Sequence, residues 1–153
     1  MRCNDFTSEI QCKLDDFFKT MYSSRGLKYD PKGKHKDLRD IYYTYQANGG
    51  GFWVLLDGDK IIGTTGLKIL DRDNGIGEVK RMAVLPDYQG KGYGKLLLNH
   101  LIDEARIRSL SILRLDTMKS YDKALNLYHR AGFYKIERYN DNLFAEVYME
   151  MKL

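Results

Sequence analysis

A glycine-rich turn between a strand-like run and a helix-like run is the feature that most constrains how this chain can fold. The turn, Gln89–Lys95, reads QGKGYGK and holds three glycines. Glycine allows positive φ angles and lets another group approach the backbone closely. The run 76–85 predicts a strand, and leucines spaced three and four residues apart after the turn predict a helix to about Arg108. This order directs free backbone N–H groups and the positive end of a helix dipole at an anion.

The residues around these glycines narrow the type of anion. Lys91 and Lys95 add positive charge beside the turn, which favours a phosphate-bearing ligand. The turn is not a nucleotide P-loop, because no Gly-Lys-Ser/Thr closes it, and its glycine spacing differs from the Gly-x-Gly-x-x-Gly of dinucleotide sites. A turn with a purely structural role remains the alternative at this point.

The composition predicts one globular domain, and its modest positive charge suits an anionic ligand. The chain has 153 residues and a formal net charge of +4, which allows one hydrophobic core and is too dispersed to predict a nucleic-acid partner. No apolar run approaches the roughly 18 residues of a membrane span, and the N-terminus lacks the apolar core of a signal peptide. We therefore expect no membrane partner. Cys3 and Cys12 form no metal-binding pair, so we expect no metal site and reduced thiols in a cytoplasmic protein.

Hydrophobic periodicity divides the chain into helices and strands. We expect helices over 8–23, 37–47, from the glycine turn to 108, and 120–131, and strands over 52–57, 60–70, 76–85, 112–116, 133–138 and 143–151. Ser8 with Gln11 predicts a capping box, Ser120 predicts an N-cap, and Trp53 is expected in the core. The pattern predicts a mixed α+β fold with a largely antiparallel sheet and one β-α-β crossover, from strand 76–85 to strand 112–116.

Two motifs resemble the GNAT superfamily of N-acetyltransferases. The first, Gln-x-x-Gly-x-Gly at 89–94, is similar to that family's pyrophosphate loop, and the second is Tyr-x-x-x-Gly-Phe at 128–133. The resemblance extends from Phe52 to the C-terminus, and the residues at 78–82 and 114–117 look like those of a bacterial subgroup whose acceptor is unknown.

The resemblance implies one acetyltransferase domain over 1–153. Its fold would be α+β (α/β mixed), with a central, mostly antiparallel mixed sheet of six to seven strands flanked by about four helices. The family usually begins with a strand, and because residues 1–7 favour a strand poorly, we expect that strand to be absent or displaced. Tyr121 stands where many members carry an asparagine, so one side-chain contact to the cofactor is expected to be missing.

The resemblance also implies that acetyl-CoA is the co-substrate and that two backbone segments bind it. Met82, Ala83 and Val84 would bind the pantetheine arm through backbone groups. The turn would hold the pyrophosphate through Gln89, Gly90, Lys91, Gly92, Tyr93, Gly94 and Lys95. In a regular strand Glu78, Lys80, Met82 and Val84 would share one face.

Acetyl transfer to an amine requires loss of a proton from the ammonium group and stabilisation of the departing thiolate. An amine with a pKa of about 10.4 is neutral in about one of several thousand molecules at pH 7, which costs about 4–5 kcal/mol. Glu78 is the candidate base, since the histone-modifying branch carries its base eleven residues before the motif glutamine. Tyr128 is the candidate acid, since the family places this tyrosine next to the thioester sulfur. The alternatives are a Glu78 salt-bridged to Lys80 or Arg81, and a Tyr128 that only packs in the core.

The implied function is transfer of an acetyl group from acetyl-CoA to a primary amine of a small molecule, peptide or protein, by direct attack on the thioester. The alternative is a catalytically weak acyl-CoA-binding regulatory module of the same fold. The acceptor stays open among small amines, aminoglycosides, amino acids, peptide N-termini and protein lysines. Arg81, Tyr139 and Asn142 are candidates to border it, and Asp116 is expected to be structural. The oligomeric state stays open, although an exposed final strand could pair two copies into a homodimer.

Overall fold

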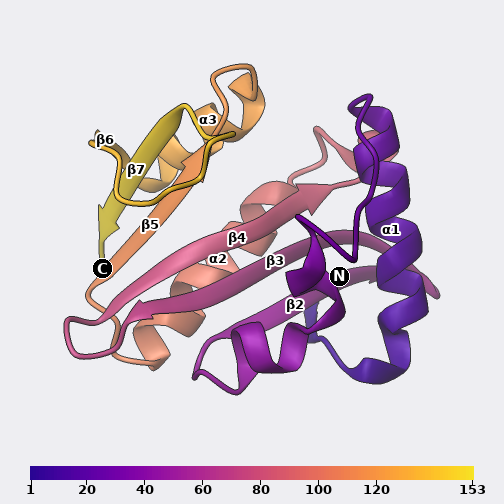
Figure 1. Ribbon diagram of the computed structural model, residues 1–153, viewed down its shortest axis with the longest axis horizontal. Helices are drawn as coiled ribbons and strands as arrows, with labels where there is room; N and C mark the ends of the chain where they lie inside the picture. The colour runs from indigo at the N-terminus through magenta and orange to yellow at the C-terminus, as the bar shows by residue number, and fades with distance from the viewer.

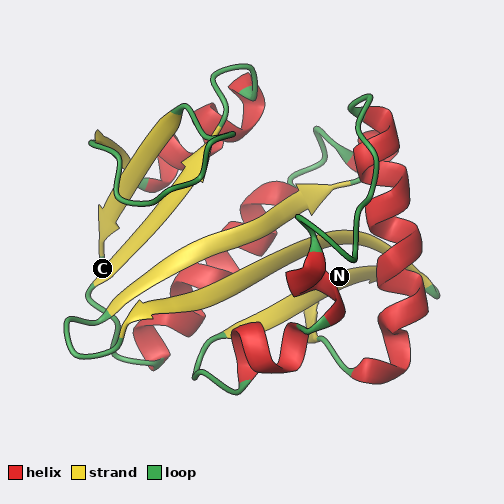
Figure 2. Cartoon of the chain, viewed as in Figure 1, coloured by secondary structure: helices red, strands yellow, loops and turns green.

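The computed structural model describes residues 1–153 and contains one seven-stranded sheet with helices on both faces (Figure 1, Figure 2). The strands lie in the order β1-β2-β3-β4-β5-β7-β6. They are β1 Cys3–Asp5, β2 Gly51–Asp57, β3 Lys60–Asp71, β4 Ile76–Val84, β5 Ile112–Thr117, β6 Tyr134–Ile136 and β7 Val147–Lys152. All neighbours are antiparallel except β4 and β5, which are parallel. The predicted mixed sheet with one parallel crossover is therefore confirmed.

Helices cover both faces of the sheet. On one face lie α1 (Gln11–Ser24) and the short helices η2 (Lys36–Arg39) and η3 (Tyr42–Gln46), whereas α2 (Tyr93–Ile107) and α3 (Asp122–Ala131) lie behind the other (Figure 1). The stripe of α2 that faces the sheet is fully buried at Leu97, Leu98, Leu101 and Ala105. Trp53 belongs to the same apolar cluster and is 2% exposed, so its expected place in the core is confirmed.

The N-terminal region differs from the expectation in two respects. A first strand is present, because β1 pairs with β2 and places Cys3 opposite Leu55. This strand has three residues, which is too few to give an alternating pattern in the sequence. The predicted capping box is wrong: Ser8–Ile10 forms a 3-10 turn, η1, and no side chain caps α1. Gln11 instead donates its side-chain amide to the Leu38 carbonyl at 2.9 Å.

The single helix predicted over 37–47 is instead the 3-10 turn η2 followed by the π-helix η3. In η3 the Ala47 N–H donates to the Tyr42 carbonyl at 2.7 Å, which is a five-residue spacing. Tyr45 is fully buried, and its hydroxyl donates to Asp37 Oδ2 at 2.6 Å. This contact fixes the end of η3 against η2 in a way that helical periodicity does not encode.

The C-terminal region also corrects two predictions. α3 begins at Asp122, with Tyr121 as its N-cap residue and no side-chain cap, so Ser120 does not cap it. β7 lies between β5 and β6 and is paired on both sides, which leaves the three-residue β6 at the sheet edge. A homodimer through an exposed final strand is therefore ruled out, because that strand has no free edge; a homodimer by another surface stays a prediction.

β4 and β5 are paired only where they begin. Their last pair is Glu78 opposite Arg114, although β4 continues to Val84 and β5 to Thr117. Beyond that pair the two strands diverge, as Figure 1 shows. We call this divergence the fork. It leaves the side of β4 that faces β5 without a strand partner over its second half.

A β-bulge interrupts β4 just beyond the fork. Lys80 lies opposite Gly66, and Ala83 lies opposite Thr64, so two residues of β4 face a single residue of β3. Arg81 lies in the bulge with a φ angle of 51°, which is in the left-handed region. The Thr64 hydroxyl donates to the Arg81 carbonyl at 2.7 Å and holds the bulge in place.

The bulge reverses the side-chain faces of β4 beyond it. Ala83 shares the face of Glu78 and Lys80, whereas Met82 and Val84 point to the opposite face, toward α2. The expectation that Glu78, Lys80, Met82 and Val84 share one face is therefore wrong. It assumed an uninterrupted strand, and nothing in the local sequence indicates the extra residue of the bulge.

Candidate functional site

The glycine turn has the backbone conformation that its sequence predicts. Gly90 and Gly92 have φ angles of 75° and 87°, and Gly92 is the N-cap residue of α2 without any side-chain cap. A Cβ atom at either position would meet nothing within 4 Å, so these two glycines serve backbone conformation and openness rather than packing. Gly94 differs, because a Cβ there would lie 3.3 Å from Leu127 of α3.

Six consecutive backbone N–H groups in this turn have no acceptor within the protein. The first N–H that bonds in α2 is that of Leu96, which donates to the Gly92 carbonyl at 3.1 Å. The unbonded groups belong to Gly90, Lys91, Gly92, Tyr93, Gly94 and Lys95. They form an open cradle at the positive end of the α2 dipole, with two lysine side chains beside it, which is the arrangement that binds a phosphate.

Gln89 connects this cradle to the end of β4. Its side-chain amide donates to the Val84 carbonyl at 3.0 Å. The Val84 carbonyl is therefore already bonded, while the N–H groups of the turn remain free. Gln89 thus acts here as a brace that sets the distance between the turn and the fork.

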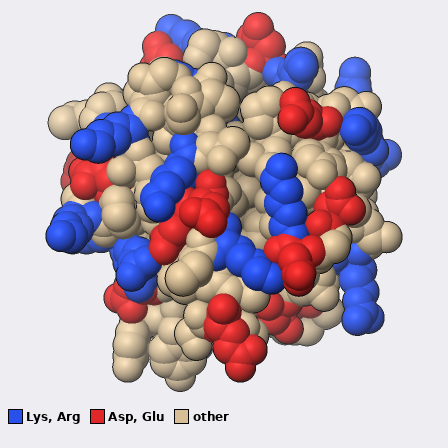
Figure 3. Space-filling model, turned by 90° about the vertical axis from the view of Figure 1, so that its right-hand side faces the viewer, with Lys and Arg blue, Asp and Glu red and all other residues tan.

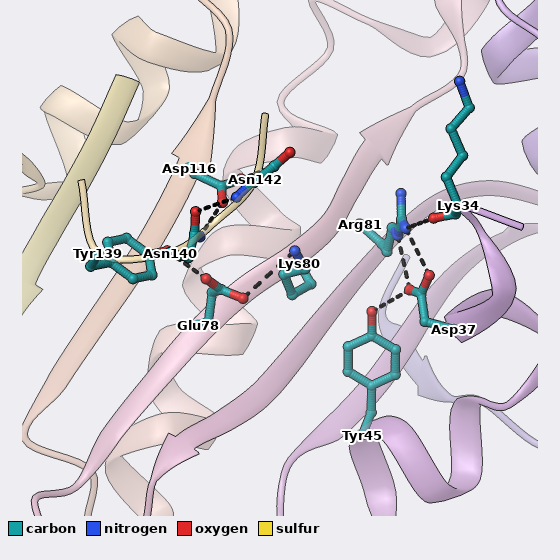
Figure 4. Close-up of polar contacts among 10 residues, drawn as sticks. All are labelled: Lys34, Asp37, Tyr45, Glu78, Lys80, Arg81, Asp116, Tyr139, Asn140 and Asn142. Atoms are coloured by element: carbon teal, nitrogen blue, oxygen red, sulfur yellow. Dashed lines mark hydrogen bonds and ion pairs between the residues drawn. The ribbon is translucent and has the colours of Figure 1, made fainter. Parts of the chain in front are cut away.

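A buried carboxylate lies where the fork begins. Glu78 is 4% exposed, and the Tyr139 hydroxyl donates to its Oε2 at 2.5 Å. The Lys80 Nζ lies 3.6 Å from Oε1 (Figure 4). Burial first, and then the negative charge of Glu78, raise the pKa of Tyr139 well above its usual range, so the phenol keeps the proton that it donates. The ion pair with Lys80, which the sequence left as the alternative for Glu78, is present, whereas Arg81 bonds to Asp37.

A second carboxylate, Asp116, lies on β5 across the fork. Asn140 donates to its Oδ2 at 2.5 Å, and Asn142 donates to its Oδ1 at 3.2 Å (Figure 4). These asparagines and Tyr139 lie on the segment 137–146 between β6 and β7, which crosses the face of the sheet at the fork. The sequence indicated Tyr139 and Asn142 but not Asn140, and the only available signal was the polar run Asn140–Asn142.

Together these groups line a cavity of about 500 Å³ on this face of the sheet. Glu78, Asp116 and Tyr139 all contribute to its wall. The cavity therefore has one buried carboxylate at the fork and a polar rim, which suits a small polar ligand.

Tyr128 lies on the other side of the sheet. It is 7% exposed and packs edge-on against Phe133, with 5.8 Å between ring centroids. Burial raises its pKa to about 12, which the positive charge of Arg25 partly offsets, and its hydroxyl makes no hydrogen bond within the protein. Because Tyr128 belongs to the same apolar cluster as Val79, it faces away from Glu78, and the two sides meet only through the fork.

Arg81 braces the bulge instead of lining the cavity. Its Nε and Nη2 donate to Asp37 at 2.9 and 2.7 Å, and its Nη1 donates to the Tyr22 hydroxyl at 2.8 Å. Figure 4 shows this cluster apart from the Glu78 cluster. The guanidinium thus ties β4 to α1 and η2, and the expectation that Arg81 borders an acceptor gives way to a bracing role.

The face that α1 presents carries no charged patch. On the side that α1 presents, acidic and basic side chains are interspersed and form no single-sign patch (Figure 3). No group of three or more His, Cys, Asp or Glu residues could hold a metal ion. No helix is both long enough and apolar enough to cross a membrane.

Comparison with known proteins relates this geometry to one family. The model of the acetyltransferase (GNAT) family matches residues 16–133. The uncharacterised N-acetyltransferase YsnE of Bacillus subtilis is 37% identical over 92 residues, which are 59% of this chain and 60% of that protein. The matches to the first curated relatives span 50 to 60% of those proteins' lengths.

Solved structures show the same fold. The acetyltransferase of GNAT family from Staphylococcus aureus Mu50 superposes with a TM-score of 0.89 at 23% identity, covering 99% of this chain and 98% of that one. The PaiA N-acetyltransferase from Thermoplasma acidophilum, solved in complex with coenzyme A, superposes with a TM-score of 0.73 at 19% identity, covering 99% and 98%. The overall fold is thus shared with these two structures.

Proposed function

Because the chain belongs to the acetyltransferase (GNAT) family, we propose that it transfers the acetyl group of acetyl-CoA to a primary amine. The observation that carries the proposal is the cradle of six unbonded N–H groups at the start of α2. A diphosphate accepts hydrogen bonds from such groups, and glycines at 90 and 92 leave room for it. Lys91 and Lys95 would add charge.

The fork offers a path from the cradle to the cavity. The unpaired side of β4, over Met82 and Ala83, has backbone groups that an extended pantetheine arm could bond as a strand would. Acetyl-CoA would supply the thioester carbonyl. Its place between the strands would put the acetyl group between Glu78 on one face and Tyr128 on the other.

Glu78 would take the proton that the acceptor amine must lose. Its carboxylate lies at the fork and lines the cavity, so a bound amine reaches it directly or through one water molecule. The ammonium of Lys80, 3.6 Å from Oε1, disfavours a second positive charge nearby and so favours the neutral amine. The nitrogen lone pair then attacks the carbonyl carbon, the C–S bond breaks, and the nitrogen loses its second proton to solvent as the amide forms.

Tyr128 would stabilise the departing thiolate by a hydrogen bond. Its pKa of about 12 exceeds that of a thiol by about 3.5 units, so complete proton transfer would cost about 5 kcal/mol. A hydrogen bond that strengthens as negative charge develops on sulfur needs no such transfer. The thiolate then acquires its proton from solvent.

A second candidate function is a module that binds acyl-CoA without efficient catalysis. Two observations favour it: both oxygens of Glu78 already have partners, and Tyr121 replaces a family asparagine. The two functions share the cradle and differ only in turnover.

The test combines calorimetry with thiol detection. Titration with acetyl-CoA should give binding at micromolar concentrations, and a panel of amines should give acceptor-dependent release of coenzyme A. Binding without release from any amine would support the regulatory module, whereas absence of binding would refute both functions.

A further inference from the structure

The cavity at the fork has more unbonded cationic donors than its formal charge of zero suggests. Three cationic side chains line it, those of Lys68, Lys80 and Arg114, and three carboxylates, those of Asp71, Glu78 and Asp116. A count of formal charges gives zero. What a ligand meets, however, depends on which of these groups are already bonded.

All three carboxylates are bonded within the protein. Glu78 accepts the hydrogen bond from Tyr139, and Asp116 accepts from two asparagine amides. Asp71 accepts from the backbone N–H of Asn74 at 3.0 Å and from its side-chain amide at 2.7 Å. Their oxygens therefore already accept hydrogen bonds from the protein's own neutral donors, although each carboxylate keeps its negative charge.

The cationic side chains keep more free hydrogen-bond donors, although two of them are ion-paired. Lys68 forms no ion pair and no hydrogen bond, and Lys80 makes only the 3.6 Å contact with Glu78. Arg114 is ion-paired through Nε with Glu150 at 2.9 Å and lies over the Tyr139 ring, but its two terminal nitrogens make no hydrogen bond. The donors that remain free in the cavity therefore belong to cationic groups.

The sheet places these donors around the candidate base. Lys68 of β3 lies opposite Glu78 of β4, and Glu78 lies opposite Arg114 of β5. Residues directly opposite each other share a face of the sheet with Cβ atoms about 5 Å apart. Glu78 is thus flanked by a cation on each neighbouring strand, within the span of one small molecule.

From this arrangement we infer that the acceptor carries a carboxylate close to its primary amine, as a free amino acid does. The inference rests on the proposed function. The carboxylate binds the free donors of Lys68 and Arg114, and the amine is held at Glu78. Polyamines and aminoglycosides lack a carboxylate and would leave these cationic donors unpaired, so we expect them to be poor acceptors.

The experiment compares matched acceptors that differ only in the carboxylate. L-Amino acids, their α-amides and spermidine are tested with acetyl-CoA by thiol release. Removing the carboxylate lowers the pKa of the amine, so the amide has the more available lone pair, and a preference for the acid must come from binding. We expect kcat/KM to be about ten- to a hundredfold higher for the acids, as for a charge-assisted hydrogen bond.

Lys68→Ala should remove most of this preference. We expect KM for the amino acid to rise about tenfold or more, with kcat and the values for the amide little changed, while Lys68→Arg retains the preference. Lys135→Ala is the control, because Lys135 of β6 is exposed and in register with buried Met149, on the opposite face. It should leave both acceptors unaffected.

The outcomes distinguish failure of this inference from failure of the proposed acetyl transfer. Amides or spermidine acetylated as well as the acids, or an unchanged KM in Lys68→Ala, would overturn the inference while acetyl transfer stands. If no amine releases thiol, the proposed function fails. In that case calorimetry of L-alanine against L-alaninamide, with coenzyme A present, still decides: tighter binding of the acid supports the carboxylate site, and equal binding refutes it.

Discussion

The Tyr139 hydroxyl donates a 2.5 Å hydrogen bond to the Glu78 carboxylate, although 61 positions separate the two residues in the chain. This bond joins the segment between β6 and β7 to the fork. It supplies the partner that a nearly buried carboxylate requires. The candidate base and one wall of the cavity are therefore held together by one side-chain contact.

Tyr139→Phe should destabilise the protein by about 1–3 kcal/mol at pH 8, because a buried charged acceptor loses its donor. The loss should shrink at higher pH. Burial and the charge of Glu78 raise the pKa of Tyr139 above that of an unfolded tyrosine. The protonated Tyr139 hydroxyl therefore contributes its full stabilisation below about pH 10, the pKa of an unfolded tyrosine. That contribution is lost as pH rises above this value. Urea unfolding at pH 8 and pH 10.5 measures both effects.

Tyr134→Phe is the matched control. Its hydroxyl also donates to a carboxylate, Glu150, at 2.9 Å, but Tyr134 is 40% exposed. Water can replace that bond, so we expect a loss of stability much smaller than that of Tyr139→Phe. Equal losses of stability in both variants would contradict the view that burial makes the bond of Tyr139 the stronger one.

Tyr128→Phe should lower kcat by about ten- to a few-hundredfold, in the range for a group that stabilises a leaving thiolate. The free energy of unfolding should change little, because the hydroxyl has no partner within the protein and the ring keeps its contact with Phe133. Steady-state thiol release and urea unfolding check the two parts. Turnover within twofold of the unmodified chain would remove Tyr128 from the mechanism.

Tyr29→Phe provides the comparison for this change. Tyr29 is also buried, but its hydroxyl donates to Asp15 at 2.9 Å, on the N-terminal side of the molecule. We expect the Tyr29→Phe variant to be less stable but to keep its turnover, whereas Tyr128→Phe should keep its stability and lose turnover.

The cradle was predictable from the sequence because its causes are local. Glycines at 90 and 92 adopt the positive φ angles that their residue type allows, and α2 begins directly after them. The leucine spacing of α2 likewise follows from burial against the sheet. Strands and helices with these periodic patterns were placed to within a few residues.

The surroundings of Glu78 were less predictable because they depend on contacts between distant segments. Asn140 reaches Asp116 from 24 positions away, and no periodic pattern marks such a pair. The bulge at Arg81 is similar: a non-glycine residue adopts a positive φ because Asp37 and Thr64 hold it, not because of its own preference. Tertiary contacts decide these positions.

Gly92→Asp should weaken acetyl-CoA binding by about a hundredfold or more, because a carboxylate would face the diphosphate. Gly58→Asp is the control. Gly58, in the turn between β2 and β3, also has a positive φ, of 58°, and nothing within 4 Å of a Cβ. Both variants therefore place an aspartate at an open position of positive φ, although the 87° of Gly92 is the more strained of the two. Calorimetry with unchanged affinity in Gly92→Asp would refute the assignment of the cradle.

Arg81→Ala should destabilise the protein by about 2–4 kcal/mol at pH 7, since it leaves Asp37 without its charged partner. Burial alone would raise the pKa of Asp37, but the hydrogen bonds and charge of Arg81 hold it below its usual range. Such a group stabilises the fold above its unfolded pKa and loses that contribution as pH falls through the folded value. The difference from the unmodified chain should therefore narrow below about pH 4.

The same variant should also weaken acetyl-CoA binding, because the bulge that Arg81 braces borders the unpaired side of β4. Arg106→Ala is the control: this arginine is 57% exposed and lies 3.7 Å from Asp103, so its removal should cost less than about 0.5 kcal/mol. Urea unfolding at pH 7 and pH 3.5, with calorimetry at pH 7, tests both effects. A stability loss in Arg81→Ala that does not vary between these pH values would mean that packing, and not the ion pair with Asp37, holds the bulge.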